Sequence, residues 1–449
     1  MKIKFLGAAG LVTGSSYLLT SGSGQSILID LGMFQGPHDI DKLNFEPFDV
    51  DCSTLSGVVL THAHLDHCGR LPILLPKRFR KKMYMTSETR DLTELSLFDT
   101  AKIAKENDRT FLFDKELVEQ TIKQFSVVSY RTPFRIGDFT ITMRDAGHIL
   151  GSASLEIIDA NPNSSMQKIV FSGDLGNSPE PLLMETELIE LADAVVMEST
   201  YGDRIHPSTD PALAIQKEIN LIEQSGGTLL IPAFALERTQ ELLHIIMHLK
   251  KDGKVSPITP VYLDSPMAKT ATEIYSQNLL VCNAHIQTDR KKGHPFQFQG
   301  LTIIDHVSES SAIINNKGPE VIIAGSGMMT GGRILGHAGR FLPIPSTRLL
   351  IVGWQGEGTL GRMLLNGNKK VRIGRVSVPI HGTINNIETM SSHADQTKLL
   401  RWLKNIKNVK KIFLTHGDDI PRSALAQKIS KDLEIMDITL PLLHREIAF

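Results

Sequence analysis

The residues best suited to chemistry lie in the segment His62-Ala63-His64-Leu65-Asp66-His67, directly after the apolar run Gly57-Val58-Val59-Leu60. Three imidazoles and one carboxylate in six positions are typical of a metal site, because these are donor groups that Zn²⁺ binds. Side chains alternate along an extended strand end, so His62 and His64 can bind one ion. Asp66 and His67 can then bind a second ion. The spacing predicts a metal-dependent hydrolase with two ions, and zinc is the favoured metal.

The alternative is a chance grouping on a solvated surface, because the chain holds 16 histidines among 449 residues. Four ligand-type side chains in six positions, at a predicted strand end, are not typical of such a surface. Cys68 follows His67, but a site already rich in nitrogen and oxygen donors does not need a thiolate. We therefore interpret Cys68 as a small buried residue.

Four later strands end in residues of the same ligand types. An α/β fold gathers functional groups at such ends, because the strands are rigid and the loops after them are free to vary. We therefore expect these segments to converge on the first motif. They are Asp145-Ala146-Gly147-His148, Ser172-Gly173-Asp174, Met197-Glu198 and Thr415-His416.

The elements that must position these residues follow a mixed α/β pattern. Short apolar strands alternate with polar or Gly-rich turns up to about residue 200, and a second α/β pattern opens near His206, with helices predicted at 210–224 and 236–250. Ligand-type residues return from about 385. The predicted division is 1–205, an inserted domain 206–384, and 385–449 as a return to the first domain. More than one domain suits the length, because single cores rarely exceed about 250 residues.

Composition limits the partners and the compartment. With 48 basic and 49 acidic residues, a polyanionic partner must be attracted by a local patch or by bound metal ions. Three cysteines cannot build a disulfide framework, which favours a reducing compartment, the cytoplasm. No stretch reaches the roughly 18 apolar residues of a membrane span, so we expect no membrane partner.

Three segments of the insert complete a family resemblance: Pro232 to Glu241, Asp264-Ser265-Pro266-Met267-Ala268, and Gly325-Ser326-Gly327-Met328-Met329. With the ligand segments they resemble the metallo-β-lactamase-fold nucleases of the β-CASP family, over essentially the whole chain. That family includes the nuclease subunit of mRNA cleavage and polyadenylation, RNase J and stand-alone prokaryotic ribonucleases. The resemblance implies an α/β fold, a metallo-β-lactamase αββα sandwich formed by 1–205 and 385–449, with an inserted β-CASP α/β domain.

Carried over to this chain, the resemblance implies two Zn²⁺ per chain and a hydroxide shared between them that attacks phosphorus. For His148 the alternative is a buried structural histidine, and for Asp174 a turn residue after Gly173. The implied ligands are His62, His64 and His148 for one ion, Asp66, His67 and His416 for the other, and Asp174 as the bridge.

The resemblance also implies a proton donor for the leaving oxygen. His393 resembles the general acid and Glu198 the carboxylate that orients it, because a paired imidazole stays protonated more readily. With Asp66 and Asp174 they form the predicted catalytic set. The alternatives are a surface residue at a helix start for His393 and a structural hydrogen bond for Glu198. Asp30 resembles a carboxylate that orients a ligand histidine, or it is a simple turn former.

The Gly-rich segment from Gly325 to Arg333 follows an apolar strand and can cradle a phosphate with its backbone N–H groups, although such turns often serve geometry alone. For Phe234 the alternative is packing. His244 and His248 share a helical face, but no glutamate follows His244 as in zinc proteases, so we interpret them as ordinary helix residues. The RNA contacts that the resemblance implies are Phe234, Arg238, Ser326, Arg333, His337 and Ser391.

The predicted function is a zinc-dependent ribonuclease of RNA processing or decay that hydrolyses phosphodiester bonds of single-stranded RNA, more as an endonuclease than as an exonuclease. One alternative is a small-molecule metallo-hydrolase of the thioesterase or lactonase type, which would not need the insert. Another is a non-catalytic RNA-binding relative, which the filled ligand positions disfavour. Asp418 stands where the family often has Glu, which leaves the support of His416 open. A homodimer is compatible with the resemblance.

Overall fold

The computed structural model describes residues 1–106, 112–161 and 166–449. Its contacts divide the chain into two compact units. Unit 1 comprises Met1–Ile205 and Ser392–Phe449, and unit 2 comprises His206–Ser391. The strand Thr383–Asn386 pairs within unit 2, so that unit continues past the predicted boundary at 384.

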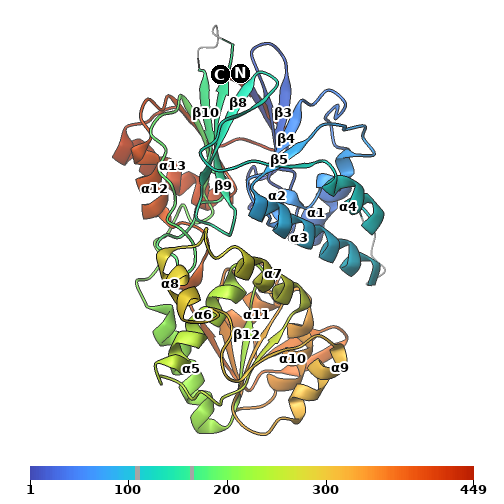
Figure 1. The fold of residues 1–449 in the computed structure, drawn as a ribbon, viewed down its shortest axis with the longest axis vertical. Helices are drawn as coiled ribbons and strands as arrows, with labels where there is room; N and C mark the ends of the chain where they lie inside the picture. Colours follow the sequence, from blue (N-terminus) through green and yellow to red (C-terminus); the bar gives the residue numbers. More distant parts are fainter. Residues whose placement is uncertain (107–111, 162–165) are drawn as a thin grey trace. The chain divides into compact units, whose positions relative to one another are not determined.

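Unit 1 contains two seven-stranded sheets (Figure 1). The first has the order β22 (Glu446–Ala448), β1 (Lys2–Phe5), β2 (Tyr17–Thr20), β3 (Ser26–Ile29), β4 (Gly57–Val59), β5 (Met83–Met85) and β6 (Phe125–Val127). The second has the order β21 (Ile438–Thr439), β20 (Lys411–Thr415), β11 (Ala194–Glu198), β10 (Lys168–Phe171), β9 (Ala153–Asp159), β8 (Phe139–Asp145) and β7 (Phe134–Ile136).

Apolar side chains point alternately to the two faces of the strands, which explains why the two sheets pack face to face. Ile27 and Ile29 of β3 join Ile169 and Phe171 of β10 in one buried apolar cluster, whereas Leu28 joins a second cluster on the outer face. Successive side chains of a strand point to opposite faces, so one apolar strand serves both layers. Each such buried side chain contributes about 1.5–3 kcal/mol of hydrophobic free energy.

Helices cover the outer face of each sheet, which completes the four layers (Figure 1). Leu399 and Trp402 of α12 and Leu425 of α13 pack on the outer residues of β10, β11 and β20. The αββα sandwich is therefore confirmed. The helices of unit 1 are α1 (His38–Asp41), α2 (Leu65–Cys68), α3 (Ser87–Glu106), α4 (Lys115–Ile122), α12 (Gln396–Asn405) and α13 (Asp419–Leu433).

Unit 2 is built on a six-stranded sheet whose neighbouring strands all pair in parallel. Its order is β14 (Leu301–Ile303), β13 (Val261–Asp264), β15 (Glu320–Ala324), β12 (Thr228–Pro232), β16 (Arg348–Ile351) and β19 (Thr383–Asn386). The five residues of β12 and those of β15 are all buried, as expected for a parallel sheet covered on both faces.

The two helices predicted in the insert are present. The first begins after Asp210, whose carboxylate accepts a hydrogen bond from the Ala212 N–H, and ends at Gly226 in a left-handed conformation. Unit 2 contains α5 (Pro211–Ser225), α6 (Arg238–Lys251), α7 (Pro266–Gln277), α8 (Ala284–Lys292), α9 (Val307–Ala312), α10 (Arg333–Phe341), α11 (Leu360–Leu365) and the hairpin of β17 (Lys370–Ile373) and β18 (Val376–Pro379).

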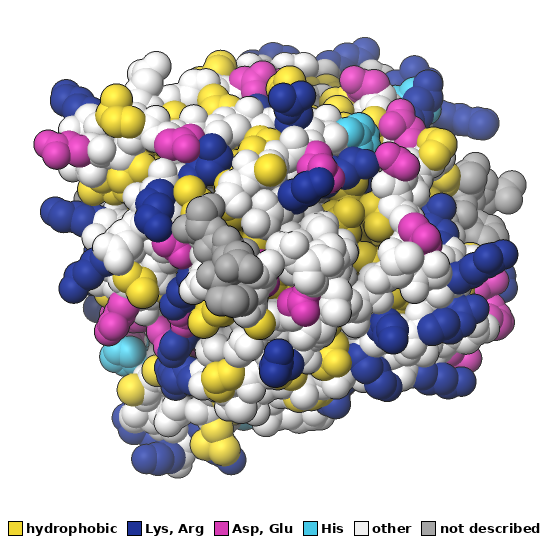
Figure 2. All heavy atoms as spheres, turned by 90° about the horizontal axis from the view of Figure 1, so that it is seen from above, with side chains coloured by type: hydrophobic (Ala, Val, Ile, Leu, Met, Phe, Trp, Pro, Cys, Tyr) yellow, Lys and Arg dark blue, Asp and Glu magenta, His cyan; other side chains and the backbone are white. Residues whose placement is uncertain are grey.

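Among the described residues, no helix combines the length and the apolar character that crossing a membrane requires. Figure 2 shows one face of the molecule, on which Lys and Arg side chains alternate with Asp, Glu and apolar groups. This mixture agrees with the near-zero net charge of the sequence. The net charge therefore does not attract a polyanion, and local groups of positive charge or bound cations must do so.

Candidate metal centre

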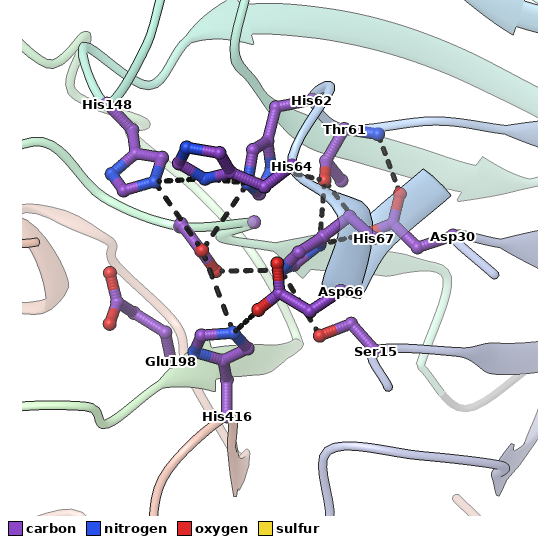
Figure 3. A network of polar contacts seen from close by, with 12 residues as sticks. Ser15, Asp30, Thr61, His62, His64, Asp66, His67, His148, Glu198 and His416 are labelled. Atoms are coloured by element: carbon purple, nitrogen blue, oxygen red, sulfur yellow. Dashed lines mark hydrogen bonds and ion pairs between the residues drawn. The ribbon is translucent and has the colours of Figure 1, made fainter. Parts of the chain in front are cut away.

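Five strands of unit 1 deliver the ligand-type side chains to one place (Figure 3). His62 follows β4, His148 follows β8, and His416 follows β20, while Asp174 follows β10 and Glu198 ends β11. The loop after β4 is held tightly, because a Cβ on Gly32 would lie only 1.5 Å from the carbonyl oxygen of Asp66. The predicted convergence of these distant segments is present in the structure.

One group of ligand atoms consists of three imidazoles and one carboxylate. His64 Nδ1 lies 3.1 Å from His62 Nε2 and 3.2 Å from His148 Nε2. Asp174 Oδ2 lies 3.4 Å from His62 Nε2 and 3.6 Å from His148 Nε2. These four side chains present their donor atoms to one small volume, as the ligands of a single cation do.

A second group shares the same carboxylate. His416 Nε2 lies 3.3 Å from Asp66 Oδ2, and the three ligand atoms of Asp66, His67 and His416 lie within 4.8 Å of one another. Asp174 Oδ1 is 3.3 Å from His67 Nε2, and its Oδ2 is 3.7 Å from His416 Nε2. Asp174 therefore lies between the two groups, at the position of a bridging ligand.

Hydrogen bonds outside the cluster set the tautomers of its histidines. The N–H of His67 at Nδ1 donates to the Asp30 carboxylate at 2.8 Å, and that of His148 donates to the Ser392 carbonyl at 3.1 Å. In both rings Nε2 therefore faces the centre, and a neutral ring that carries its one proton on Nδ1 presents a bare nitrogen there.

Two threonine hydroxyls have the same effect on the other rings. Thr61 Oγ1 donates to Asp30 at 2.8 Å and so can accept the proton at His62 Nδ1, which is 3.1 Å away. Thr200 Oγ1 donates to the His416 carbonyl at 3.1 Å and can accept from His416 Nδ1 at 3.0 Å. The Nε2 atoms of four histidines therefore face the centre.

The ionisation of the cluster also suits a cation. Burial lowers the pKa of His62 and His148 well below the usual range and that of His64 to about 4, so these rings are neutral. Burial raises the pKa of Asp174, but His416 and His67 outweigh it and hold that pKa well below its usual range. Burial lowers the pKa of His67, but Asp174 and Asp30 outweigh it and raise that pKa well above its usual range, so a cation at this ring would replace a proton. Within the described part of the chain the buried Oδ1 of Asp174 accepts no hydrogen bond of good geometry. Imidazole nitrogens around an ionised, incompletely satisfied carboxylate fit positive ions.

Sequence reasoning identified part of the surrounding support. Asp30 fulfils both interpretations that the sequence left open, since its carboxylate orients His67 and its backbone is left-handed at φ 55°. Thr61, Thr200 and the Ser392 carbonyl were missed. Thr61 stands beside His62 in the sequence, which is a usable signal, whereas a backbone carbonyl has none. The sequence left open whether Asp418 supports the ring of His416. In the structure Thr200 provides this support, through its contact with His416 Nδ1.

Beside the cluster, His393 pairs with Glu198. His393 Nδ1 lies 3.2 Å and 3.3 Å from the two Glu198 oxygens, and the Leu175 N–H donates to one of them at 2.6 Å. Burial lowers the pKa of His393, but Glu198, Asp174 and Asp66 outweigh it and raise the pKa to about 9. The side chain is 20% exposed. It is thus a protonated imidazole with access to solvent.

The residues predicted to contact RNA lie in unit 2 and differ in exposure. Phe234 is 38% exposed and packs against the Gly-rich turn, where a Cβ on Gly327 would meet its ring at 2.5 Å. Ser326 is half-buried, and Ser391 is buried. Arg238 is buried against Glu241.

Arg333 and His337 have an internal partner. Arg333 donates to Asp264 Oδ1 at 2.5 Å, and His337 bonds Asp264 Oδ2 at 2.6 Å. His337 is only 1% exposed, whereas the Arg333 side chain is 19% exposed. Contact with RNA remains a prediction for this set of residues.

Comparison with known proteins gives three matches along the chain. Residues 9–212 match the metallo-β-lactamase superfamily, 239–364 the β-CASP domain, and 377–441 the Zn-dependent metallo-hydrolase RNA specificity domain. Ribonuclease TTHA0252 of Thermus thermophilus is 36% identical over 96% of both chains. The chain belongs to the β-CASP family. The β-CASP protein described here is therefore a metal-dependent hydrolase, and the resemblance predicted from its motifs is confirmed.

Other β-CASP relatives extend over most of the chain as well. An RNase J-like protein of Methanocaldococcus jannaschii is 31% identical over 91% of both chains. Cleavage and polyadenylation specificity factor subunit 3-I of Arabidopsis thaliana is 27% identical over 94% of this chain and 60% of its own length. The match to a Zn-dependent family agrees with the metal-binding character of the cluster around Asp174.

Proposed function

We propose that the protein is a ribonuclease that holds two Zn²⁺ and hydrolyses phosphodiester bonds of single-stranded RNA, mainly as an endonuclease. The observation that carries this proposal is the position of Asp174 between two groups of imidazole nitrogens. Relatives named as ribonucleases that match along nearly the whole chain support it. So does the match of residues 377–441 to an RNA specificity domain.

In this proposal each ligand group holds one ion. The ions would acidify water to supply the nucleophile and stabilise the negative charge that develops on the phosphate. Their ligands are His62, His64 and His148 for the first, Asp66, His67 and His416 for the second, and Asp174 for both.

His393 would protonate the leaving oxygen. Glu198 contacts its Nδ1, so Nε2 is the nitrogen that would donate its proton to the substrate. The bond between phosphorus and the 3′ oxygen breaks, that oxygen takes the proton, and the products are a 3′-hydroxyl and a 5′-phosphate. Glu198 is a positioning residue in this scheme, because it acts through His393.

Unit 2 would bind the RNA chain. Phe234 and Ser326 are the strongest candidates, since an exposed aromatic ring stacks on bases and a Gly-rich turn offers N–H groups to phosphate. Arg238, His337 and Ser391 are buried, so they would act by positioning the residues that contact RNA. Arg333, partly exposed beside Asp264, would contribute charge at its edge.

The compartment and the assembly are part of the same proposal. All three cysteines are buried thiols outside any disulfide, which suits the reducing cytoplasm. Burial also raises the pKa of the Cys68 thiol, as expected of a packed residue that is no metal ligand. Light scattering on the purified protein tests the homodimer.

The experiment is cleavage of an end-labelled single-stranded RNA by the zinc-loaded protein, with mapping of both product ends. We expect internal cuts with 5′-phosphates, and loss of cutting with a chelator or in Asp174→Ala. Asp203→Ala, which changes an aspartate paired with Arg204 outside the cluster, serves as the matched control. Rapid hydrolysis of a thioester or lactone without RNA cleavage would contradict the proposal. Tight RNA binding without cleavage would contradict it too.

A further inference from the structure

Unit 2 contains a second cluster of ligand-type residues, formed by two of its helices. His244 and His248 lie one turn apart on α6, and Asp289 reaches them from α8. His244 Nε2 is 3.0 Å and His248 Nε2 is 2.8 Å from Asp289 Oδ2. The two Nε2 atoms are 3.1 Å apart. Three donor atoms thus form a nearly equilateral triangle.

Hydrogen bonds to the same Asp289 oxygen can hold both rings, but they crowd the two ring nitrogens together. Each Nε2 carries either one N–H, which has one direction, or one lone pair. If both rings are protonated there, two N–H groups face each other across 3.1 Å. If one ring carries no proton on Nε2, the single N–H of the other ring is shared between that ring and Asp289. One shared cation would satisfy all three atoms at once.

The dimensions fit a first-row divalent cation. Tetrahedral Zn²⁺ with ligands at about 2.0–2.1 Å places those ligands about 3.3 Å apart, so the triangle needs to open by only a few tenths of an ångström. The same spacing occurs around Asp174, where imidazole nitrogens lie 3.1 and 3.2 Å apart. Two imidazoles with one carboxylate are a ligand set for transition metals rather than for Mg²⁺ or Ca²⁺.

The surroundings hold the ligands in the form that binds metal. Burial lowers the pKa of His244, which favours its neutral ring. Burial raises the pKa of Asp289, but His244 and His248 outweigh it and keep the pKa below its usual value. The His248 side chain is 37% exposed, so an ion can enter and take a water as a further ligand.

A metal link would also serve the packing of α8. Of the nine residues of this helix only Ile286 is buried, so little apolar burial attaches it to the rest of unit 2. His244 is anchored in α6, most of whose residues are buried. A cation held by both helices supplies the missing attachment.

We propose that His244, His248 and Asp289 form a structural site for a divalent transition metal, with Zn²⁺ as the preferred ion, that ties α8 to α6. This proposal replaces the interpretation of the two histidines as ordinary helix residues. The sequence pattern lacked the third ligand, because Asp289 lies on a different helix. The site is independent of the ribonuclease proposal, since none of its residues belongs to the cluster around Asp174.

The test is made in the protein of residues 1–449 carrying His62→Ala and Asp174→Ala, which weakens the other metal groups. Zinc per chain is measured after dialysis, and the melting temperature is followed during zinc titration. We expect one zinc per chain more than in the same protein with His248→Gln. We also expect zinc at about a hundredfold excess over Kd to raise Tm by about 5–10 °C, and this rise to be lost with His248→Gln.

His381→Gln is the matched control, because it removes an exposed histidine of the same unit. It should keep both the zinc and the Tm response. Asp289→Asn provides a second variant whose fold is checked by circular dichroism, and it should behave like His248→Gln. Equal zinc content and equal Tm response in the parent, His248→Gln and Asp289→Asn proteins would overturn the proposal.

Discussion

Each unit has a buried aspartate at a strand end that contacts at least one histidine, yet the two aspartates differ in how their hydrogen bonds are satisfied. In unit 2, Asp264 accepts from Arg333, His337 and Ser310 at 2.5, 2.6 and 2.5 Å, so both of its oxygens have donors. In unit 1, Asp174 faces the ring nitrogens of the ligand histidines, and its Oδ1 has no hydrogen-bond partner among the described residues. A complete set of donors indicates a structural aspartate, whereas an incomplete set indicates a site that needs a ligand.

The largest effect is expected when the proton donor beside Asp174 is removed while the metal ligands stay in place. We expect His393→Ala to lower kcat for RNA cleavage by about 10²–10⁴-fold, because the leaving oxygen loses its proton donor. Zinc content should stay at the wild-type value, which elemental analysis checks. A loss of zinc together with activity would instead make His393 part of the metal site.

The structural side of the comparison is tested at Asp264. Asp264→Asn should lower the free energy of unfolding by about 2–4 kcal/mol, because Arg333 and His337 lose a buried anionic partner. Urea denaturation measures this change. The control is Asp305→Asn, which removes an exposed carboxylate paired with Lys269 and should change stability by less than about 0.5 kcal/mol. Equal effects of the two variants would contradict the structural role of Asp264.

A smaller effect is expected at Glu198. Its carboxylate raises the pKa of His393, so the acid form persists below that pKa and is lost as pH rises through it. Asp66 and Asp174 also raise the pKa of His393, and bound cations would cancel that part of the increase. We therefore expect kcat to fall on the alkaline side of its pH profile at or below about pH 9. Glu198→Gln should move this limb to lower pH and reduce kcat about tenfold. A pH–rate profile with an unmoved limb would remove Glu198 from the proton-donor pair.

The smallest effect concerns the support of a ligand. Thr200→Val keeps the shape of the side chain but removes the acceptor for His416 Nδ1. We expect the affinity for the second zinc to fall about tenfold, because the ring loses its fixed tautomer. Competition with a chromogenic chelator measures this. Thr20→Val, which changes a threonine bonded to Ser26 at the far end of β2, is the control, and an equal loss there would contradict the assignment.

The sequence allowed much of unit 1 to be predicted. Ligand-type residues after short apolar strands indicated convergence, and the motifs indicated the αββα sandwich. The partners of Arg333 and His337 could not be predicted, because Asp264 lies far from both in the sequence and meets them only in the fold. For the same reason Asp289 was missed beside His244 and His248. The Ser392 carbonyl was beyond reach, because every residue has a carbonyl.

The position of β20 in its sheet has a consequence during synthesis. This strand pairs with β11, although unit 2 separates the two along the chain, and it ends beside His416. A growing chain on the ribosome can therefore carry His62, His148 and Asp174 while His393 and His416 are still untranslated. The proposed cleavage by a nascent chain therefore cannot begin until translation has passed these two residues and β20 has paired with β11.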